Sequence, residues 1–176
     1  MKQSITPTFV LGMKEACNTF LCPIEANVYD ISYGKSLMKN LANNQIISEF
    51  SPPGGFMPLP STDKQRFLQF SITSDFLKYH SISVGFEYKI GPKELKNFRY
   101  IERSYCKNKL VKCYDVEFGE CPPNSIKYKE IQLNSQLFSE QEISEIVKHS
   151  EKCKIDGFYF NENNLFLHLR SEITFK

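Results

Sequence analysis

The side chains that could do chemistry in this chain are few and scattered. The 176 residues hold three histidines (His80, His149 and His168) and six cysteines. No two cysteines form a C-x-x-C pair, and no histidine lies near them in a metal-binding pattern. The chain also lacks a Gly-x-Ser-x-Gly elbow, a His-Glu-x-x-His pair and a glycine-rich phosphate loop. The sequence therefore predicts no metal site, no cofactor and no enzyme.

Composition restricts the compartment and the partners. The net charge of +2 is too small to indicate a nucleic-acid partner. No apolar run approaches the length of a membrane span, and residues 1–18 lack the apolar core of a signal peptide. These features predict a cytoplasmic protein with no integral membrane segment. Because disulfides are rare in the cytosol, we expect the cysteines to be reduced thiols used as small core or surface residues.

One carboxylate, Glu102, lies in a stretch with clear patterning. Residues 97–125 read as two antiparallel strands joined by a turn at 107–109. In the second strand, apolar and polar side chains alternate, which is typical of a strand with one buried face. The apolar positions are Leu110, Tyr114, Val116 and Phe118. Lys112 interrupts this face, so we expect one end of it to reach solvent.

The remaining segments supply the elements that would hold this hairpin. Strands are expected over residues 27–40, 46–50, 66–73, 76–90, 126–133, 157–160 and 165–173. Thr6-Pro7 begins a short helix that Gly12 would end, and Ser139 with Glu142 forms a capping box that begins a helix over 139–149. This pattern predicts an all-β, antiparallel, immunoglobulin-like β-sandwich. We expect a single domain over 1–176, with segment 1–25 packed on it and the helix covering one edge or end.

Two features of the sequence are compatible with a ligand-binding cavity but do not require one. The loop 51–65 holds four prolines and two glycines, and it is either packed on the surface or a flap beside a hydrophobic mouth. The chain has 15 Phe and 9 Tyr, which either fill the space between the sheets or line a cavity. In the strand alternation at 165–169, the three leucines are expected on one face, with Phe166 and His168 on the other. The residues alone thus predict a binding or interaction module.

The stretch FRYIERSYCKNKLVKCYDVEFGECPPNS resembles the signature of the uncoordinated-type (Unc) lipid-binding chaperones, relatives of the phosphodiesterase delta subunit. Blocks TPTFVLG, FLCPIEANVYDI, LFSEQEISEIVKH and DGFYFNENNLFLH extend the resemblance over nearly the whole chain. It implies a hydrophobic cavity between the sheets that takes up the myristoyl chain of N-terminally acylated cargo proteins. It further implies release by an Arf-like small GTPase in its GTP state, and protein transport toward membranes of a cilium or flagellum.

The resemblance also implies a set of lipid-binding residues. They are Met38, Leu68, Phe70, Phe86, Glu102, Ser104, Tyr114, Phe118, Tyr159 and Leu167. Well-known relatives have Tyr in place of Phe70, His in place of Ser104 and Phe in place of Tyr114. Glu102 is expected near the entrance, accepting hydrogen bonds from the backbone of the cargo, or else in a structural pair with Arg103 or a lysine. A prenyl carrier and a GTPase effector without lipid remain the alternatives.

Overall fold

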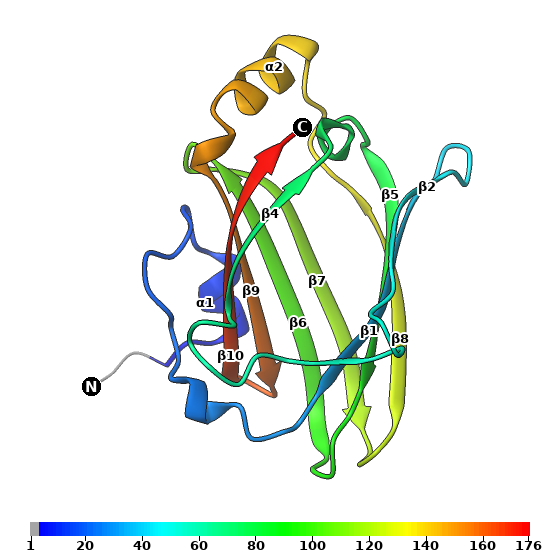
Figure 1. Cartoon of the computed structure of the whole chain (residues 1–176), viewed down its shortest axis with the longest axis vertical. Coiled ribbons are helices and arrows are strands. Elements are labelled where there is room, and N and C mark those ends of the chain that lie inside the picture. Colours follow the sequence, from blue (N-terminus) through cyan, green and yellow to red (C-terminus); the bar gives the residue numbers. More distant parts are fainter. Residues whose placement is uncertain (1–3) are drawn as a thin grey trace.

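The computed structural model describes residues 4–176 and folds them into two β-sheets that face each other (Figure 1). The first sheet has the order β2 (Ile46–Phe50), β1 (Ser32–Asn40), β5 (Ser81–Lys89) and β8 (Ile126–Asn134), with β3 (Met57–Pro58) also paired to β1. The second has the order β4 (Phe67–Ile72), β10 (Asn164–Phe175), β9 (Cys153–Asn161), β6 (Leu95–Cys106) and β7 (Lys109–Cys121). The all-β, immunoglobulin-like sandwich is confirmed.

One strand pair departs from the antiparallel prediction. The edge strand β4 runs parallel to β10, with Arg170 opposite Phe67 and Phe175 opposite Ile72. The loop between β2 and β4 crosses from the first sheet to the second, so β4 enters the second sheet as an edge strand beside the C-terminal strand. All other pairs in both sheets are antiparallel.

The predicted hairpin forms one side of the second sheet, with β6 paired to β9 and β7 at the edge. Strands β6 and β7 are joined by Lys107 and Asn108, which have φ values of 50° and 60°. Two positive φ values are what a two-residue turn requires to match the twist of the strands it joins. The two strands are 12 and 13 residues long, so the hairpin spans the whole height of the sandwich.

Both predicted helices form. Helix α1 (Pro7–Leu11) begins after Thr6, whose hydroxyl accepts the N–H of Phe9 at 3.2 Å, and it ends at Gly12. Helix α2 (Glu140–Lys148) begins at the capping box of Ser139 and Glu142, and it lies across one end of the sandwich (Figure 1). Short 3-10 turns, η1 (Ile24–Ala26), η2 (Ser74–Leu77) and η3 (Ser150–Lys152), occupy segments next to strands. Because η2 includes residues 76 and 77, β5 begins later than the sequence predicts; β1 also begins later, at Ser32 and not at 27.

The alternation expected at residues 165–169 is confirmed for Leu167, His168 and Leu169 and is wrong for Leu165 and Phe166. The pairing of β10 with β9 shifts register between Leu165 and Leu167. This bulge sends Leu165 to a cluster on the outer face, whereas Phe166 and Leu167 both pack in the core between the sheets. A β-bulge adds one residue to one strand, so the side chains after it change faces relative to those before it.

The segment from residue 4 to 26 lies against the outer face of the second sheet. Val10 packs there with Ile101 and Phe158. Arg103 on β6 fixes the segment further, because its guanidinium donates to the carbonyl oxygens of Leu11 at 2.7 Å and Met13 at 2.9 Å. The first three residues of the predicted segment 1–25 lie outside the described residues.

The expectation that every cysteine is a free thiol is wrong. Cys106 and Cys153 are direct partners in the register of β6 and β9, their Cα atoms are 4.1 Å apart, and they form a disulfide. The two residues are 47 positions apart in sequence, so only the strand pairing brings them together. The other four cysteines, Cys17, Cys22, Cys113 and Cys121, are free.

Candidate functional site

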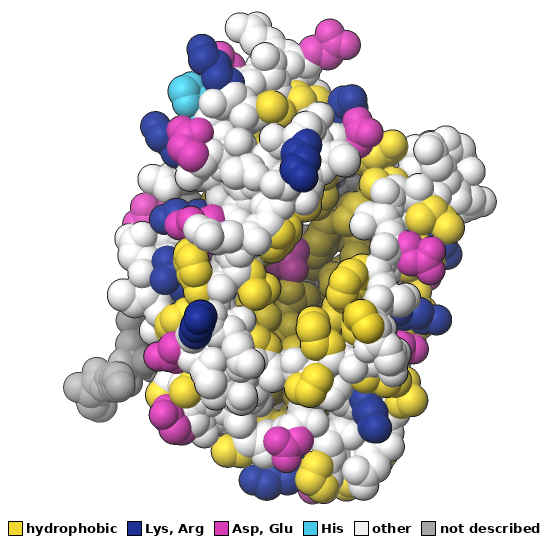
Figure 2. Space-filling view, viewed as in Figure 1, with side chains coloured by type: hydrophobic (Ala, Val, Ile, Leu, Met, Phe, Trp, Pro, Cys, Tyr) yellow, Lys and Arg dark blue, Asp and Glu magenta, His cyan; other side chains and the backbone are white. Residues whose placement is uncertain are grey.

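A deep cavity lies between the two sheets and opens where the edge strands β2 and β4 stay apart. It has two chambers, of about 620 and 720 Å³, that share Tyr33, Leu68, Phe86, Tyr100, Glu102 and Leu169 as lining residues. The volumes fall in the range of about 300–1,000 Å³ that is usual for small-molecule sites. Figure 2 shows this hollow from its open side, walled by hydrophobic side chains with an acidic group inside.

The space between the sheets is closed at the end away from α2 and along the side opposite the mouth. At the end away from α2, aromatic rings fill the interior: Phe98 lies 5.2 Å from Tyr88 and 4.9 Å from Phe118, measured between ring centroids. Strands β7 and β8 are in contact along the side opposite the mouth. The sandwich is therefore packed on two sides and hollow on the third.

Large apolar side chains face the hollow with no protein group covering them. Leu68 and Phe70 on β4 are both 41% exposed, although they point toward the other sheet. Across the gap lie Met38 on β1 and Phe86 on β5. Exposed apolar surface inside a concave site is the usual mark of a binding site for an apolar ligand.

The loop 51–65 borders the mouth. Its residues 57–61 line the first chamber, together with Gln65. Leu59 is buried, and its N–H donates to the carbonyl oxygen of Ile31 at 2.9 Å, which ties the loop to the start of β1. This placement favours the flap interpretation over that of a loop packed on a closed surface.

Among the lining residues that the structure describes, Glu102 is the only charged one. Its carboxylate accepts a hydrogen bond from the hydroxyl of Tyr100, and burial raises its pKa. Arg103 points to the opposite face of the sheet, and within residues 4–176 no basic group forms an ion pair with Glu102. The structural pairing with Arg103 or a lysine is thus not formed, and the carboxylate faces the cavity.

Tyrosine hydroxyls surround this carboxylate and form a neutral polar floor. The hydroxyl of Tyr88 donates to that of Tyr159 at 3.4 Å. Burial raises the pKa of Tyr33 to about 12 and the pKa of Tyr88 and Tyr100 above its usual range. These phenols stay protonated at neutral pH, so the floor offers hydrogen bonds but no further charge.

The ten predicted lipid-binding residues divide into two groups. Lining the cavity are Met38, Leu68, Phe70, Phe86, Glu102, Tyr114 and Tyr159. Ser104, Phe118 and Leu167 lie instead in the interior without lining it: Phe118 stacks on Phe98, and Leu167 packs in the core. Sequence reasoning missed Tyr33, Tyr100 and Leu169; Tyr100 could have been found, because it is two residues before Glu102 and therefore on the same face of β6.

The expectation that the end of the apolar face near Lys112 reaches solvent is wrong. Lys112 is only 3% exposed. The end of the sandwich that carries it is covered by η2 and α2, which contact each other. Burial without a carboxylate partner lowers the pKa of the Lys112 ammonium to about 8.

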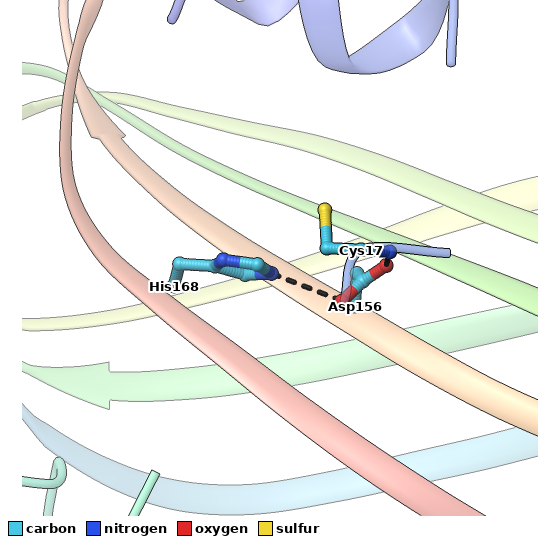
Figure 3. A group of neighbouring side chains, drawn as sticks. All are labelled: Cys17, Asp156 and His168. Carbon is cyan, nitrogen blue, oxygen red and sulfur yellow. Dashed lines mark hydrogen bonds and ion pairs between the residues drawn. The ribbon is translucent and has the colours of Figure 1, made fainter. Parts of the chain in front are cut away.

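A second polar cluster lies on the outer face of the second sheet, where Cys17, Asp156 and His168 meet (Figure 3). The N–H groups of Leu21 and Cys17 donate to His168 Nδ1 at 3.0 Å and to Asp156 at 2.8 Å. Because Nδ1 accepts, the single proton of the neutral imidazole is on Nε2, where it donates to Asp156 at 3.0 Å.

This cluster does not fit a metal ion. Although the sulfur of Cys17 lies within 4.8 Å of both other groups, neither nitrogen of His168 has a free lone pair, because Nδ1 accepts from Leu21 and Nε2 donates to Asp156. Burial also raises the pKa of Cys17 to about 12, so no thiolate is present at neutral pH. The cluster instead fixes the segment around Cys17 to the sheet.

The fold and the cavity define a class of protein: a β-sandwich that encloses an apolar ligand between its sheets. The chain belongs to the GMP-PDE, delta subunit family, whose model matches residues 25–175. It is similar to Protein unc-119 of Caenorhabditis briggsae, 30% identical over 99% of this chain and 81% of that protein. Protein unc-119 of Caenorhabditis elegans is equally similar, with the same coverage. The human Protein unc-119 homolog B is 27% identical, over 98% of this chain and 72% of that protein.

These relatives confirm the resemblance to the Unc branch of the family. Proteins of this family are lipid-binding carriers and not enzymes, although the family takes its name from an enzyme, and this chain is of the same type. Within residues 4–176, no helix is long and apolar enough to cross a membrane.

Proposed function

We propose that this protein is a soluble carrier that binds the myristoyl chain of N-terminally acylated proteins in the cavity between its sheets and delivers them to membranes. The observation that carries the proposal is the unfilled apolar hollow, in which Leu68 and Phe70 face space and Glu102 is the single charged lining residue that the structure describes. A saturated chain would cover these apolar groups, and a backbone amide would meet the carboxylate.

The energetics are consistent with a carrier. Burying alkyl carbon contributes about 0.8 kcal/mol per CH₂, so a myristoyl chain offers on the order of 10 kcal/mol before costs. One such chain anchors a protein only marginally to a membrane. An apolar cavity of about 620–720 Å³ per chamber can therefore compete with the bilayer for the chain.

Glu102 is proposed to recognise the start of the cargo. The resemblance to the Unc chaperones suggests that it accepts hydrogen bonds from backbone N–H groups of the first cargo residues. Its position, in both chambers and beside the hydroxyl of Tyr100, supports this role. Hydrogen bonds to a charged acceptor are about twice as strong as neutral ones, which would favour an N-acylated peptide over an alkyl chain alone.

Release is proposed to follow from an Arf-like small GTPase in its GTP state, and delivery to be directed to a cilium or flagellum. Both rest on membership of the family. A partner that binds a conformation with a poorer cavity lowers cargo affinity by its own preference for that conformation. No covalent step is required.

The test compares a fluorescent peptide with an N-terminal myristoyl group and the same peptide without it. We expect the acylated peptide to bind at least a hundredfold more tightly. Phe70→Asp places a charge in the cavity wall and should abolish this difference. Phe67→Asp is the matched control, because Phe67 is on the same strand and comparably exposed but does not line the cavity.

Three outcomes would count against the proposal. Equal binding of acylated and unacylated peptide would mean that the cavity does not take the chain. Displacement of the myristoyl peptide by an equimolar farnesylated peptide would indicate a prenyl carrier. Binding to a GTPase with no effect of either lipid would indicate an effector without lipid.

A further inference from the structure

The inner end of the cavity, near η2, is lined by the ring of Phe76, and a buried charged side chain, Lys112, lies behind that ring. Lys112 is on the inner face of β7, two residues before Tyr114, which lines the cavity. Its partner across the strand pair is Ser104, two residues after Glu102 on β6. The inner faces of both strands therefore change from apolar to polar at this level.

Lys112 is held firmly in place. Its ammonium donates to the hydroxyl of Ser135 at 2.9 Å and to the carbonyl oxygen of Tyr79 at 3.3 Å. Within residues 4–176, no carboxylate forms an ion pair with it. It also lies 5.0 Å from the centroid of the ring of Phe76. Because Phe76 itself lines the cavity, this ring separates the hollow from the buried ammonium.

Two further polar groups lie at or next to this level of the sandwich: Ser104 is opposite Lys112, and Tyr114 is opposite Glu102. The hydroxyl oxygens of Ser104 and Tyr114 are buried and have no hydrogen-bond partner among the described residues. Unsatisfied buried hydroxyls are uncommon in proteins and call for an explanation. Ser104 and Lys112 form a polar pair that hydrocarbon does not solvate, and Tyr114 lies two residues from Lys112 along β7.

We propose that Lys112 sets the length of the acyl chain that the cavity accepts, an inference that rests on the proposed function. A chain short enough to end at Phe76 contacts only apolar groups. A longer chain must displace the Phe76 ring from the ammonium and press CH₂ groups against a buried charge, which loses its cation–π contact and gains nothing in exchange. The expected result is a sharp limit on chain length.

The experiment measures the affinity of one peptide sequence carrying C12, C14, C16 or C18 saturated acyl groups. Each CH₂ that enters an apolar cavity raises affinity by about fourfold. For the wild type we expect about a fifteenfold gain from C12 to C14 and less than a twofold gain from C14 to C16. Lys112→Met removes the charge and keeps an unbranched side chain, so the gain should continue to C16 at about tenfold or more.

Lys129→Met, on the exposed surface of β8, is the matched control and should keep the wild-type profile. Parallel profiles for the wild type and Lys112→Met would overturn the inference. If Lys112→Met does not fold, the wild-type series decides: a constant gain per CH₂ up to C18 overturns it, and a limit at C14 supports it. If no acyl peptide binds the wild type better than the unacylated peptide, both the proposed function and this inference fail.

Discussion

Glu102 on β6 and Gly157 on β9 are direct partners in the sheet register, and the missing side chain of Gly157 leaves a hollow beside the carboxylate. A Cβ atom at position 157 would lie 3.2 Å from the hydroxyl oxygen of Tyr100, which is the group that donates to Glu102. The glycine thus keeps open both the cavity wall and the hydrogen bond that orients the carboxylate.

We therefore expect Gly157→Val to weaken the binding of a myristoylated peptide by about tenfold or more, because a side chain there fills the cavity and displaces Tyr100. Fluorescence anisotropy measures the affinity. Displacing the buried ring of Tyr100 should also lower the free energy of unfolding, by about 1–3 kcal/mol. Gly12→Ala is the control, because its Cβ would meet nothing closer than 3.5 Å. Unchanged affinity in Gly157→Val would show that the ligand does not reach this part of the cavity.

Replacing Arg103 should lower the stability of the fold without weakening ligand binding. Its guanidinium donates to Leu11, Met13 and the hydroxyl of Tyr105, all on the face away from the cavity. Hydrogen bonds to charged groups contribute about 1.5–3 kcal/mol each, so the loss of these three in Arg103→Met should lower the free energy of urea unfolding by about 4 kcal/mol or more. Affinity for the acylated peptide should stay within twofold. A large drop in affinity would mean that the segment on the outer face shapes the cavity.

Local signals predicted the elements that depend on neighbours in sequence. The Ser139–Glu142 capping box and the Thr6-Pro7 helix start formed, and the turn predicted at 107–109 formed at Lys107 and Asn108, because each is decided within a few residues. Features that depend on register were not predicted. The bulge after Leu165 depends on how β10 pairs with β9, and the pairing of Cys106 with Cys153 joins residues 47 positions apart in the chain.

Part of the candidate site could be predicted from the sequence for the same reason. Alternation along β6 and β7 identified one inward face that carries Glu102 and Tyr114, and the family resemblance added positions on other strands. Neither showed that Lys112 would be buried, because the cover comes from η2 and α2, which pack there only in the folded chain. Phe118 and Leu167 alternate correctly, yet they lie where the sheets are filled.

The disulfide gives a prediction for reducing conditions. A cross-link that closes a loop between residues 47 positions apart restricts the unfolded chain and contributes about 4 kcal/mol by the loop-entropy relation. Reduction with dithiothreitol should lower the free energy of unfolding by about this amount. The double substitution Cys106→Ala, Cys153→Ala should be insensitive to the reductant. Equal stability of the oxidised and reduced wild type would contradict a bond that stabilises the fold.

From the environment of His168 we predict that the segment from residue 4 to 26, on the outer face of the second sheet, loses stability in acid. Burial is the largest cause that lowers the pKa of His168 in the folded protein, although Asp156 partly opposes it. The unfolded chain therefore takes up a proton near pH 6.5 that the folded chain resists, so stability is present above pH 6.5 and is lost as the pH falls below it. Protonation would also place an N–H against the N–H of Leu21. Hydrogen exchange at pH 5 should show faster exchange of the Cys17 and Leu21 amides than at pH 7, after correction for intrinsic rates. Equal protection at both pH values would contradict this.

Lys112 predicts a pH effect of the same sign at the alkaline end. Its folded-state pKa of about 8 is below the usual value of 10.5, so above pH 8 the folded chain releases a proton that the unfolded chain retains. Stability from this group therefore rises with pH between about 8 and 10.5, by about 1.4 kcal/mol for each pH unit. Other groups, including Cys17 and Cys121 with raised pKa values, act in the opposite direction in the same range. The difference in free energy of unfolding between Lys112→Met and the wild type removes these shared contributions. At pH 7.5 we expect Lys112→Met to have a larger free energy of unfolding than the wild type. This difference should shrink steadily toward pH 9.5. An advantage that stays constant over that range would show that the ammonium is not held in a low-dielectric site.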